Sequence, residues 1–309
     1  METLTPILAA AVRSGTPILY ATLGEILMEK SGITNLGLEG IMLMGALSGF
    51  VVTLSTGSPW LGLLFAFLLG GCLGLLHAFL CVSLGSNQVV CGLAMTMFGS
   101  GASALMGRNH IGVAISGLHS FPLPGLAELP VLGRVFFNQD AMVYLSFALV
   151  VVLYVYLNFT RPGMNLRAIG DNPKAADAMG LPVARLRYFY CIVGSGLVAL
   201  GGGYMSVVYN KFWAEGMVAG RGWIAVAMVI FALWNPFQAA LGAYLFGGVE
   251  AFQLRLQTAG TPIPAPLLMM LPYAMTILVL LIIAVGKGRS ILLRAPAALG
   301  IPFHREERD

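Results

Sequence analysis

Residues 160–187 read TRPGMNLRAIGDNPKAADAMGLPVARLR and form the only long polar, charged interval in an otherwise apolar chain. Asn172 is placed to cap the N-terminus of a short helix, Pro173 suits its first position, and Gly180 suits its end. A helix of two turns is not stable alone in water. We therefore expect this interval to carry a short helix that docks on another surface.

The rest of the chain has the composition of an integral membrane protein. Of its 309 residues, 58% are hydrophobic and 10% are charged, whereas soluble domains carry roughly 25% charged residues. Four apolar runs have about the length that one membrane crossing requires, namely 60–84, 141–159, 237–254 and 267–285. The 39 Gly and 16 Pro favour helices that are interrupted around a cavity over simple anchors.

We expect a single transmembrane domain over residues 1–309, with about nine spans. The expected spans are 7–28, 36–54, 60–83, 88–106, 140–159, 188–208, 217–234, 237–254 and 267–285. If 160–187 is cytoplasmic, the cytoplasmic parts, including a tail at 286–309, hold 11 Lys and Arg, and the external parts hold six. The positive-inside rule supports this orientation, which places the N-terminus outside.

A weak internal repeat relates the two halves of the chain. Ser58-Pro59 precedes a helix with a Gly-Gly pair at 70–71, and Asn235-Pro236 precedes one with a Gly-Gly pair at 247–248. Inverted repeats of this kind form many transporters, with the substrate path where the repeats meet. Chance similarity between glycine-rich membrane helices is the alternative explanation.

Four polar residues in apolar surroundings are candidates for a translocation path. Glu39 lies in a stretch broken by three glycines, four residues after Asn35, and the two would share a face if that stretch were helical. The alternative for Glu39 is a structural hydrogen bond that caps or joins helices. Asn87 and Gln88 precede the fourth span, where they either cap that helix or contact cargo.

The sequence offers no catalytic constellation and no metal site. His110 and His119 are nine residues apart without a third ligand, which favours ordinary loop histidines. Residues 24–31, GEILMEKS, resemble a phosphate-binding loop, but Glu29 replaces its second glycine and would repel phosphate. We therefore expect neither an enzyme active site nor an ATP site in this chain.

Two motifs together resemble a known family. They are GITNLGLEGIMLMGA at 32–46 and RAIGDNPKAADAMGLPVARLR at 167–187, and GRGWIAVAMVIFALWNPFQAALGAYLFG at 220–247 extends the similarity. The chain resembles the permease subunits of bacterial ABC importers, in the branched-chain-type group that includes ribose, simple-sugar and nucleoside permeases. The Asn-Leu-Gly-Leu-Glu-Gly segment is most similar to nucleoside-type systems.

The resemblance implies an all-α, multi-pass inner-membrane protein with the type II importer fold, built from about eight to ten helices, some of them broken. It implies four kinds of partner: a cytoplasmic ABC ATPase that binds ATP and Mg²⁺, a second and often different permease subunit, a periplasmic or lipid-anchored solute-binding protein, and membrane lipid. No nucleic acid is expected. The loop at 160–187 would contact the ATPase through Arg167, Asp171, Asn172, Pro173, Ala175, Ala176 and Gly180.

The expected function is ATP-driven import of a small polar solute. Nucleosides are the first cargo choice, simple sugars the second and branched-chain amino acids the third. The alternatives are an ATP-independent carrier, and an intramembrane lipid-modifying enzyme that uses Glu39 or His77.

Overall fold

The computed structural model describes residues 4–129, 131–261, 263–278, 281 and 295–303. Helical residues cover 271–278, and ten further helices have six residues or more. They are α1 Leu4–Lys30, α2 Leu38–Thr56, α3 Pro59–Ala78, α4 Gln88–Gly107, α6 Ala141–Phe159, α7 Arg161–Asp171, α8 Pro173–Ala178, α9 Val183–Tyr204, α10 Arg221–Phe231 and α11 Pro236–Thr258.

The remaining elements are short. They are the π-helical turns η1 Phe79–Ser83 and η3 Met205–Tyr209, the 3₁₀ turn η2 Arg108–His110, the helices α5 Leu132–Phe136 and α12 Ala265–Met269, and the strands β1 Ser120–Pro122 and β2 Asn138–Asp140. The two strands pair antiparallel, with Ser120 opposite Asp140. The fold is thus mostly helical, and the expectation of an all-α protein misses this one small sheet.

Five helices among the described residues are long and apolar enough to cross a membrane. They span Leu38–Thr56, Pro59–Ser83, Gln88–His110, Ala141–Phe159 and Val183–Tyr209. All five coincide with spans expected from the sequence. The expected first and eighth spans correspond to α1 and α11, which are long but less apolar. The seventh is only the 11-residue α10, and the ninth, 267–285, extends beyond the described residues, as does most of the 286–309 tail.

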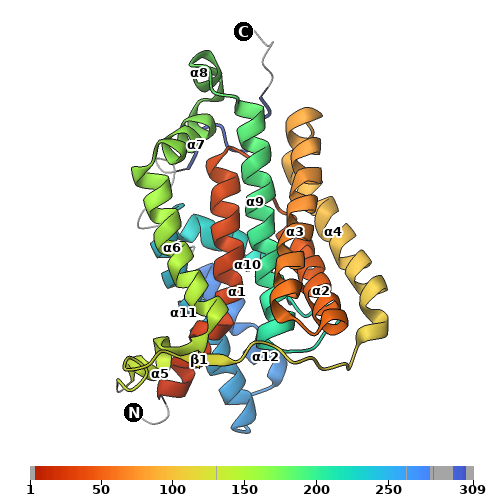
Figure 1. Cartoon of the computed structure of the whole chain (residues 1–309), viewed down its shortest axis with the longest axis vertical. Coiled ribbons are helices and arrows are strands. Elements are labelled where there is room, and N and C mark those ends of the chain that lie inside the picture. Colours follow the sequence, from red (N-terminus) through yellow and green to blue (C-terminus); the bar gives the residue numbers. More distant parts are fainter. Residues whose placement is uncertain (1–3, 130, 262, 279–280, 282–294, 304–309) are drawn as a thin grey trace.

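Figure 1 shows α1 and α9 side by side in the middle of the bundle, with α8 at one end. The first turn of α1 lies at the opposite end, near α5 and β1. The 160–187 interval and the start of the chain therefore lie at opposite ends of the bundle, as the charge count requires. The connection between α4 and α6, expected to be external, lies at the end away from α8.

The helix packing supports the internal repeat. The most extensive contacts in the molecule are those of α3 with α9 and of α11 with α1. In each repeat a central helix is followed by a helical hairpin. The first repeat consists of α1 and the hairpin α2–α3, and the second of α9 and the hairpin α10–α11. Each hairpin packs on the central helix of the other repeat. Because α1 and α9 run in opposite directions (Figure 1), the two repeats are inverted.

The two Gly-Gly pairs lie at these equivalent contacts. A Cβ atom at Gly70 would overlap Ser195 and Ala199 of α9, and one at Gly247 would overlap Ala11 and Gly15 of α1. The helix backbones touch there, so any side chain would force them apart.

We expect Gly247→Ala to destabilise the protein by about 1–3 kcal/mol, because overpacking a close helix contact forces the backbones to shift. The neighbouring Gly248→Ala is the matched control: its Cβ would lie 3.7 Å from Ala11 Cβ, an ordinary contact, and the helix propensity of Ala favours it. Thermal unfolding in detergent measures both variants. Equal melting temperatures for the two would contradict the packing described here.

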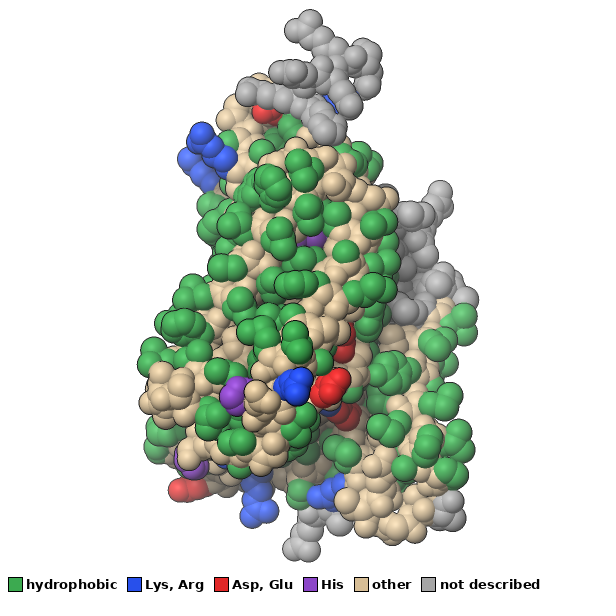
Figure 2. Space-filling view, turned by 90° about the vertical axis from the view of Figure 1, so that its right-hand side faces the viewer, with side chains coloured by type: hydrophobic (Ala, Val, Ile, Leu, Met, Phe, Trp, Pro, Cys, Tyr) green, Lys and Arg blue, Asp and Glu red, His purple; other side chains and the backbone are tan. Residues whose placement is uncertain are grey.

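The outer surface suits a bilayer. Figure 2 shows hydrophobic side chains over most of the height of the face that it presents. Large apolar residues on α3 and α4, such as Leu64, Leu68, Met97 and Phe98, are about half exposed or more. Exposed apolar area of this extent indicates contact with lipid or another membrane subunit.

Candidate functional site

Two helices, α2 and α10, begin inside the bundle rather than at its ends. After α1 ends at Lys30, the chain turns back along α1, and the Asn35 backbone N–H donates to Glu25 Oε1 at 2.9 Å. Glu25 precedes the end of α1 by five residues, which is about 7.5 Å of helix. The following helix α2 therefore starts well below the end of α1, and the turn at 31–37 is buried in the protein.

Backbone groups in this turn are held by polar side chains from two other helices. Gln88 Oε1 accepts from the Thr34 N–H at 2.8 Å, and His77 Nε2 lies 3.1 Å from the Thr34 carbonyl oxygen. Asn35 Oδ1 accepts from the Gly37 N–H at 2.8 Å. Buried backbone groups outside a helix require such partners, so these side chains fix the shape of the turn.

Glu39 joins the two repeats. Its carboxylate accepts from the Gly220 N–H and the Gly222 N–H, each at 2.8 Å. These are free donors at the N-terminus of α10, where a negative charge is also favoured by the helix dipole. Glu39 lies in the first turn of α2, so a side chain from the start of α2 caps the N-terminus of α10. Both helices begin inside the bundle.

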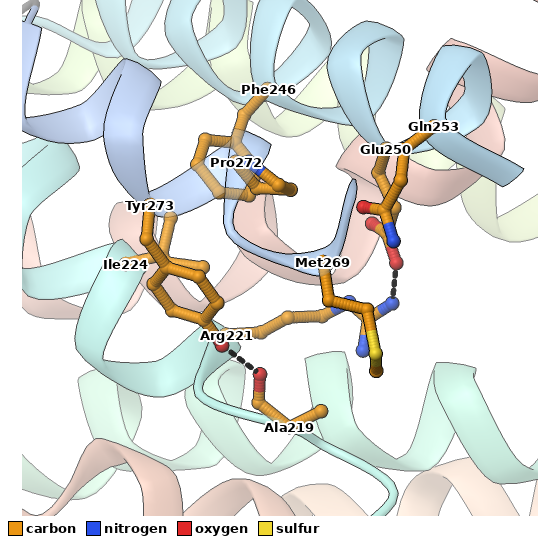
Figure 3. Close-up of a pocket in the computed structure, with 9 residues that line it drawn as sticks. All are labelled: Ala219, Arg221, Ile224, Phe246, Glu250, Gln253, Met269, Pro272 and Tyr273. Atoms are coloured by element: carbon orange, nitrogen blue, oxygen red, sulfur yellow. Dashed lines mark hydrogen bonds and ion pairs between the residues drawn. The ribbon is translucent and has the colours of Figure 1, made fainter. Parts of the chain in front are cut away.

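A pocket lies beside this junction. It has a volume of about 120 Å³ and is lined by Ala219, Arg221, Ile224, Phe246, Glu250, Gln253, Met269, Pro272 and Tyr273. Figure 3 shows the Arg221 side chain extending across it toward Glu250, with Tyr273 and Met269 on the side of α12 and the segment after it. Arg221 forms an ion pair with Glu250, and Tyr273 donates through its hydroxyl to the Ala219 carbonyl at 2.7 Å.

The short helix α8 lies at the far end of the bundle, as Figure 1 shows. Asn172 Oδ1 accepts from the Ala175 N–H at 2.9 Å, and Pro173 is the first helical residue. Gly180 has a φ of +85°, the left-handed conformation that ends helices. The cap, the start and the end that the sequence predicts for this helix are confirmed.

The two faces of α8 differ. Ala176 is buried against the protein, whereas Ala175 and Ala178 are exposed and Met179, directly after the helix, is 84% exposed. An apolar side chain this exposed at the polar end of a membrane protein favours contact with a partner.

The other two residues expected in this surface differ in their exposure. Asp171 at the end of α7 is exposed. Arg167 is half-buried, and within the described part of the chain its Nε has no hydrogen-bond partner. Asp171 is therefore free to face a partner, whereas Arg167 lies partly inside the subunit.

A segment near the C-terminus, residues 295–303, connects this end of the bundle to the buried turn. The Ala298 N–H donates to the Gly170 carbonyl of α7 at 2.9 Å, and the Gly300 N–H donates to the Gly32 carbonyl at 3.2 Å. Nearby, Arg187 Nε donates to the Ser31 carbonyl at 3.1 Å. The α7–α8 unit and the turn at 31–37 are thus joined by main-chain hydrogen bonds.

The four path candidates do not form one polar surface. Asn35 and Glu39 are not on a shared helix, because α2 begins only at Leu38. Asn87 caps α4, with Oδ1 accepting from the Val90 N–H at 3.1 Å, and Gln88 is buried on the 31–37 turn. Asn87 caps α4, as its capping alternative expects, and Glu39 makes the hydrogen bonds of its structural alternative. Gln88 does not cap α4 and bonds the Thr34 N–H instead.

Sequence reasoning missed the role of Arg221. It was counted among the external charges, but its side chain is only 12% exposed and pairs with Glu250. The signal was a single Arg between two glycines, next to an apolar run. Ser14, whose Oγ donates to Glu250 Oε2 at 2.5 Å, and Tyr273 carry no such local signal.

Comparison with known proteins identifies the family. Residues 7–280 match the profile described as "Branched-chain amino acid transport system / permease component". The "Putative glucose ABC transporter permease protein TsgC13" of Haloferax volcanii is 40% identical, over 97% of this chain and 98% of that protein.

Two further relatives also align over nearly their whole length. The nucleoside ABC transporter permease protein NupC of Lactococcus lactis is 33% identical, over 98% of each chain. The guanosine ABC transporter permease protein NupQ of Bacillus subtilis is 31% identical, over 100% of this chain and 99% of that protein. Together with the apolar helices of the bundle, these matches show that the chain is a multi-pass plasma-membrane protein and belongs to the branched-chain amino acid transport system permease family.

Proposed function

We propose that this protein is the permease subunit of an ATP-driven importer that carries nucleosides or simple sugars across the plasma membrane. The observation that carries the proposal is the full-length similarity to ABC permeases named for nucleosides, guanosine and glucose. Nucleosides stay the first choice of cargo because the 32–46 motif resembles the nucleoside-type systems. The start of α10 inside the bundle and the pocket that its first turn forms with α11 and residues 269–273 suit a solute path.

The helix α8 is the proposed contact with a cytoplasmic ATPase. Asn172, Pro173 and Gly180 define the helix, while Ala175, Ala178 and Met179 form its free face. Small residues permit close approach to a groove, and Met179 supplies a flexible apolar anchor. Ala176 packs α8 against its own subunit. Asp171 provides an exposed charge beside α8, and the half-buried Arg167 packs between α7 and the rest of the subunit.

Four partners complete the proposed transporter. ATP and Mg²⁺ bind to the ATPase. In this chain the segment 24–31 that resembles a phosphate-binding loop is helical up to Lys30 and carries Glu29 in place of a glycine. A second, homologous permease subunit pairs with this chain in a type II arrangement. A solute-binding protein delivers cargo at the end of the bundle opposite α8, and lipid surrounds the apolar belt.

Movement of α8 would reach the solute path through the segment 295–303. Because Ala298 bonds α7 and Gly300 bonds the turn at 31–37, a displacement of α7–α8 pulls on the turn that precedes α2. The start of α2 holds α10 through Glu39. In this account Asn35, Glu39, Asn87 and Gln88 position the broken helices along the path rather than bind cargo.

The cargo class is tested with the partner solute-binding protein. Purified binding protein is heated with nucleosides, nucleobases, pentoses, hexoses or branched-chain amino acids, and its melting temperature is recorded. A ligand that binds only the folded state raises the melting temperature, by an amount that grows with the logarithm of its concentration above Kd. We expect stabilisation by nucleosides. Stabilisation by sugars alone would mean that the cargo is a sugar rather than a nucleoside. Stabilisation by amino acids alone would contradict both the nucleoside and the sugar assignment.

A further inference from the structure

The pocket at the N-terminus of α10 contains a fixed, electrically neutral pair of charges. Arg221 pairs with Glu250, and Arg221 Nη1 also donates to the carbonyls of Met217 (3.4 Å) and Val218 (3.1 Å). The other carboxylate oxygen of Glu250 accepts from Ser14 Oγ. Each of the two side chains therefore has the other and at least one further hydrogen-bond partner, which fixes its position. Neither is free to move with a passing ion.

This ion pair has no obvious structural purpose. Removing two charges from water costs several kcal/mol per ion, and well-packed apolar residues often stabilise such a position as well or better. Ionisable groups inside membrane segments mark functional sites by default. The pair links α10 to α11, a link that a packed apolar pair of similar volume would make without the cost of burying charge.

The remaining walls of the pocket combine flat apolar surface with one neutral polar group. Phe246, Ile224 and Pro272 supply the apolar part, and Tyr273 presents its ring beside Arg221 (Figure 3). Gln253, whose amide both donates and accepts hydrogen bonds, lines the pocket near Glu250. Ligand sites for small neutral molecules have this character, with apolar walls and a few fixed polar groups.

We propose that this pocket is a binding site within the membrane for the hydroxyl-bearing ring of an uncharged nucleoside or sugar, with the Arg221–Glu250 pair supplying both donors and acceptors. The proposal rests on the proposed function and adds the site of solute contact. Hydroxyl groups satisfy an arginine and a carboxylate at once, because each hydroxyl donates one hydrogen bond and accepts others. A volume of about 120 Å³ lies below the roughly 300–1,000 Å³ of ligand pockets in general, so this pocket holds a ring rather than a whole nucleoside.

The neutral pair also gives the pocket a selectivity. A phosphorylated solute brings negative charge that the pocket does not balance, since Arg221 is already paired with Glu250 and the Glu39 carboxylate bonds the backbone on both sides of Arg221. An unbalanced charge in a poorly solvated site is strongly disfavoured. Uncharged solutes are therefore accepted, and their phosphorylated forms are rejected.

Protection from alkylation tests this site without requiring transport. Met269 lines the pocket and is 59% exposed, so a Met269→Cys variant, with Cys72, Cys81, Cys91 and Cys191 replaced by Ser, offers one thiol there. The assembled transporter in nanodiscs reacts with N-ethylmaleimide in the absence of ATP. Guanosine or glucose is added as the neutral probe, and the corresponding monophosphate as the charged one.

We expect the neutral solute to slow labelling about threefold at a concentration of about twice its Kd, since about two thirds of the sites are then filled. The monophosphate should give no protection. Gln253→Leu, which leaves the ion pair intact, should weaken the protection, and Glu250→Gln should abolish it. Leu126→Cys, in the exposed connection after β1, is the control thiol and should react at the same rate with and without solute.

Absence of protection by either neutral solute, or equal protection by its monophosphate, would overturn the proposed site. Because labelling needs neither ATP nor coupling, either result leaves the proposed importer function standing. Protection in a protein that fails to couple to an ATPase would contradict the proposed function alone.

Discussion

Replacement of Met179 by Glu is expected to abolish ATP-driven transport while the permease itself remains folded. Met179 is 84% exposed, so the substitution removes almost no contact within this chain, and exposed substitutions usually change stability by no more than about 0.5 kcal/mol. On binding, the new carboxylate would enter an apolar groove of the ATPase without a partner, which costs about 3–5 kcal/mol. This corresponds to a loss of roughly 150- to 5,000-fold in affinity.

Co-purification of the ATPase with the tagged permease measures that loss, and solute-stimulated ATP hydrolysis reports its consequence. Leu126→Glu is the matched control and should retain the ATPase. Leu126 is an exposed apolar residue in the connection between β1 and α5, two elements that lie at the end of the bundle away from α8 (Figure 1). If the Met179→Glu complex remains intact with normal coupled hydrolysis, α8 is not the docking element.

The two faces of α8 permit a second comparison within the same prediction. Ala175→Trp should block docking without loss of stability, because Ala175 is exposed. Ala176→Trp should lower the melting temperature of the isolated permease, because Ala176 is buried against its own subunit. Only the Ala175 variant therefore separates coupling from folding.

Replacement of Glu39 by Ala is expected to give the largest loss of stability among single substitutions in the path region. It leaves the Gly220 and Gly222 N–H groups, which now donate to Glu39, without acceptors inside the protein. Each buried donor left unsatisfied costs about 1–3 kcal/mol, so the expected destabilisation is about 2–6 kcal/mol. Transport should also be lost, since α10 no longer has a fixed start.

Thermal unfolding in detergent measures the loss of stability. Unfolding exposes the buried thiols Cys81 and Cys191, and their reaction with a fluorogenic maleimide reports it. Glu39→Gln retains one carbonyl acceptor and should lose about half as much stability. Glu128→Ala, at an exposed acid, should unfold like the parent protein. A Glu39→Ala protein as stable as the Glu128→Ala control would show that Glu39 does not hold the two repeats together.

Local sequence signals predicted the local structure well. Asn172, Pro173 and Gly180 predict the limits of α8 because capping and chain reversal depend on neighbouring residues. The same holds for Ser58 and Asn235, which cap α3 and α11 in front of a proline. Apolar runs predicted the five clear spans for the same reason.

Long-range contacts could not be predicted from the sequence. Glu39 and Gly220 are 181 positions apart, and nothing near either residue indicates that one caps the other. Arg221 falls inside the expected span 217–234 and is counted with the external charges, because a run of apolar residues does not show that the helix begins only at Arg221. The Gly-Gly pairs indicated the repeat, but only the packing of α3 on α9 and of α11 on α1 showed that its two parts exchange hairpins.

The central claim, that this chain is the membrane subunit of an ATP-driven importer, is tested most directly by uptake into proteoliposomes. The chain is reconstituted with its second permease subunit, its ATPase and its solute-binding protein, and the import of radiolabelled guanosine and glucose is followed with and without ATP. The account predicts that solute accumulates only with ATP and that the Met179→Glu complex imports none. Uptake that continues without ATP or without the ATPase would contradict the account and indicate an ATP-independent carrier.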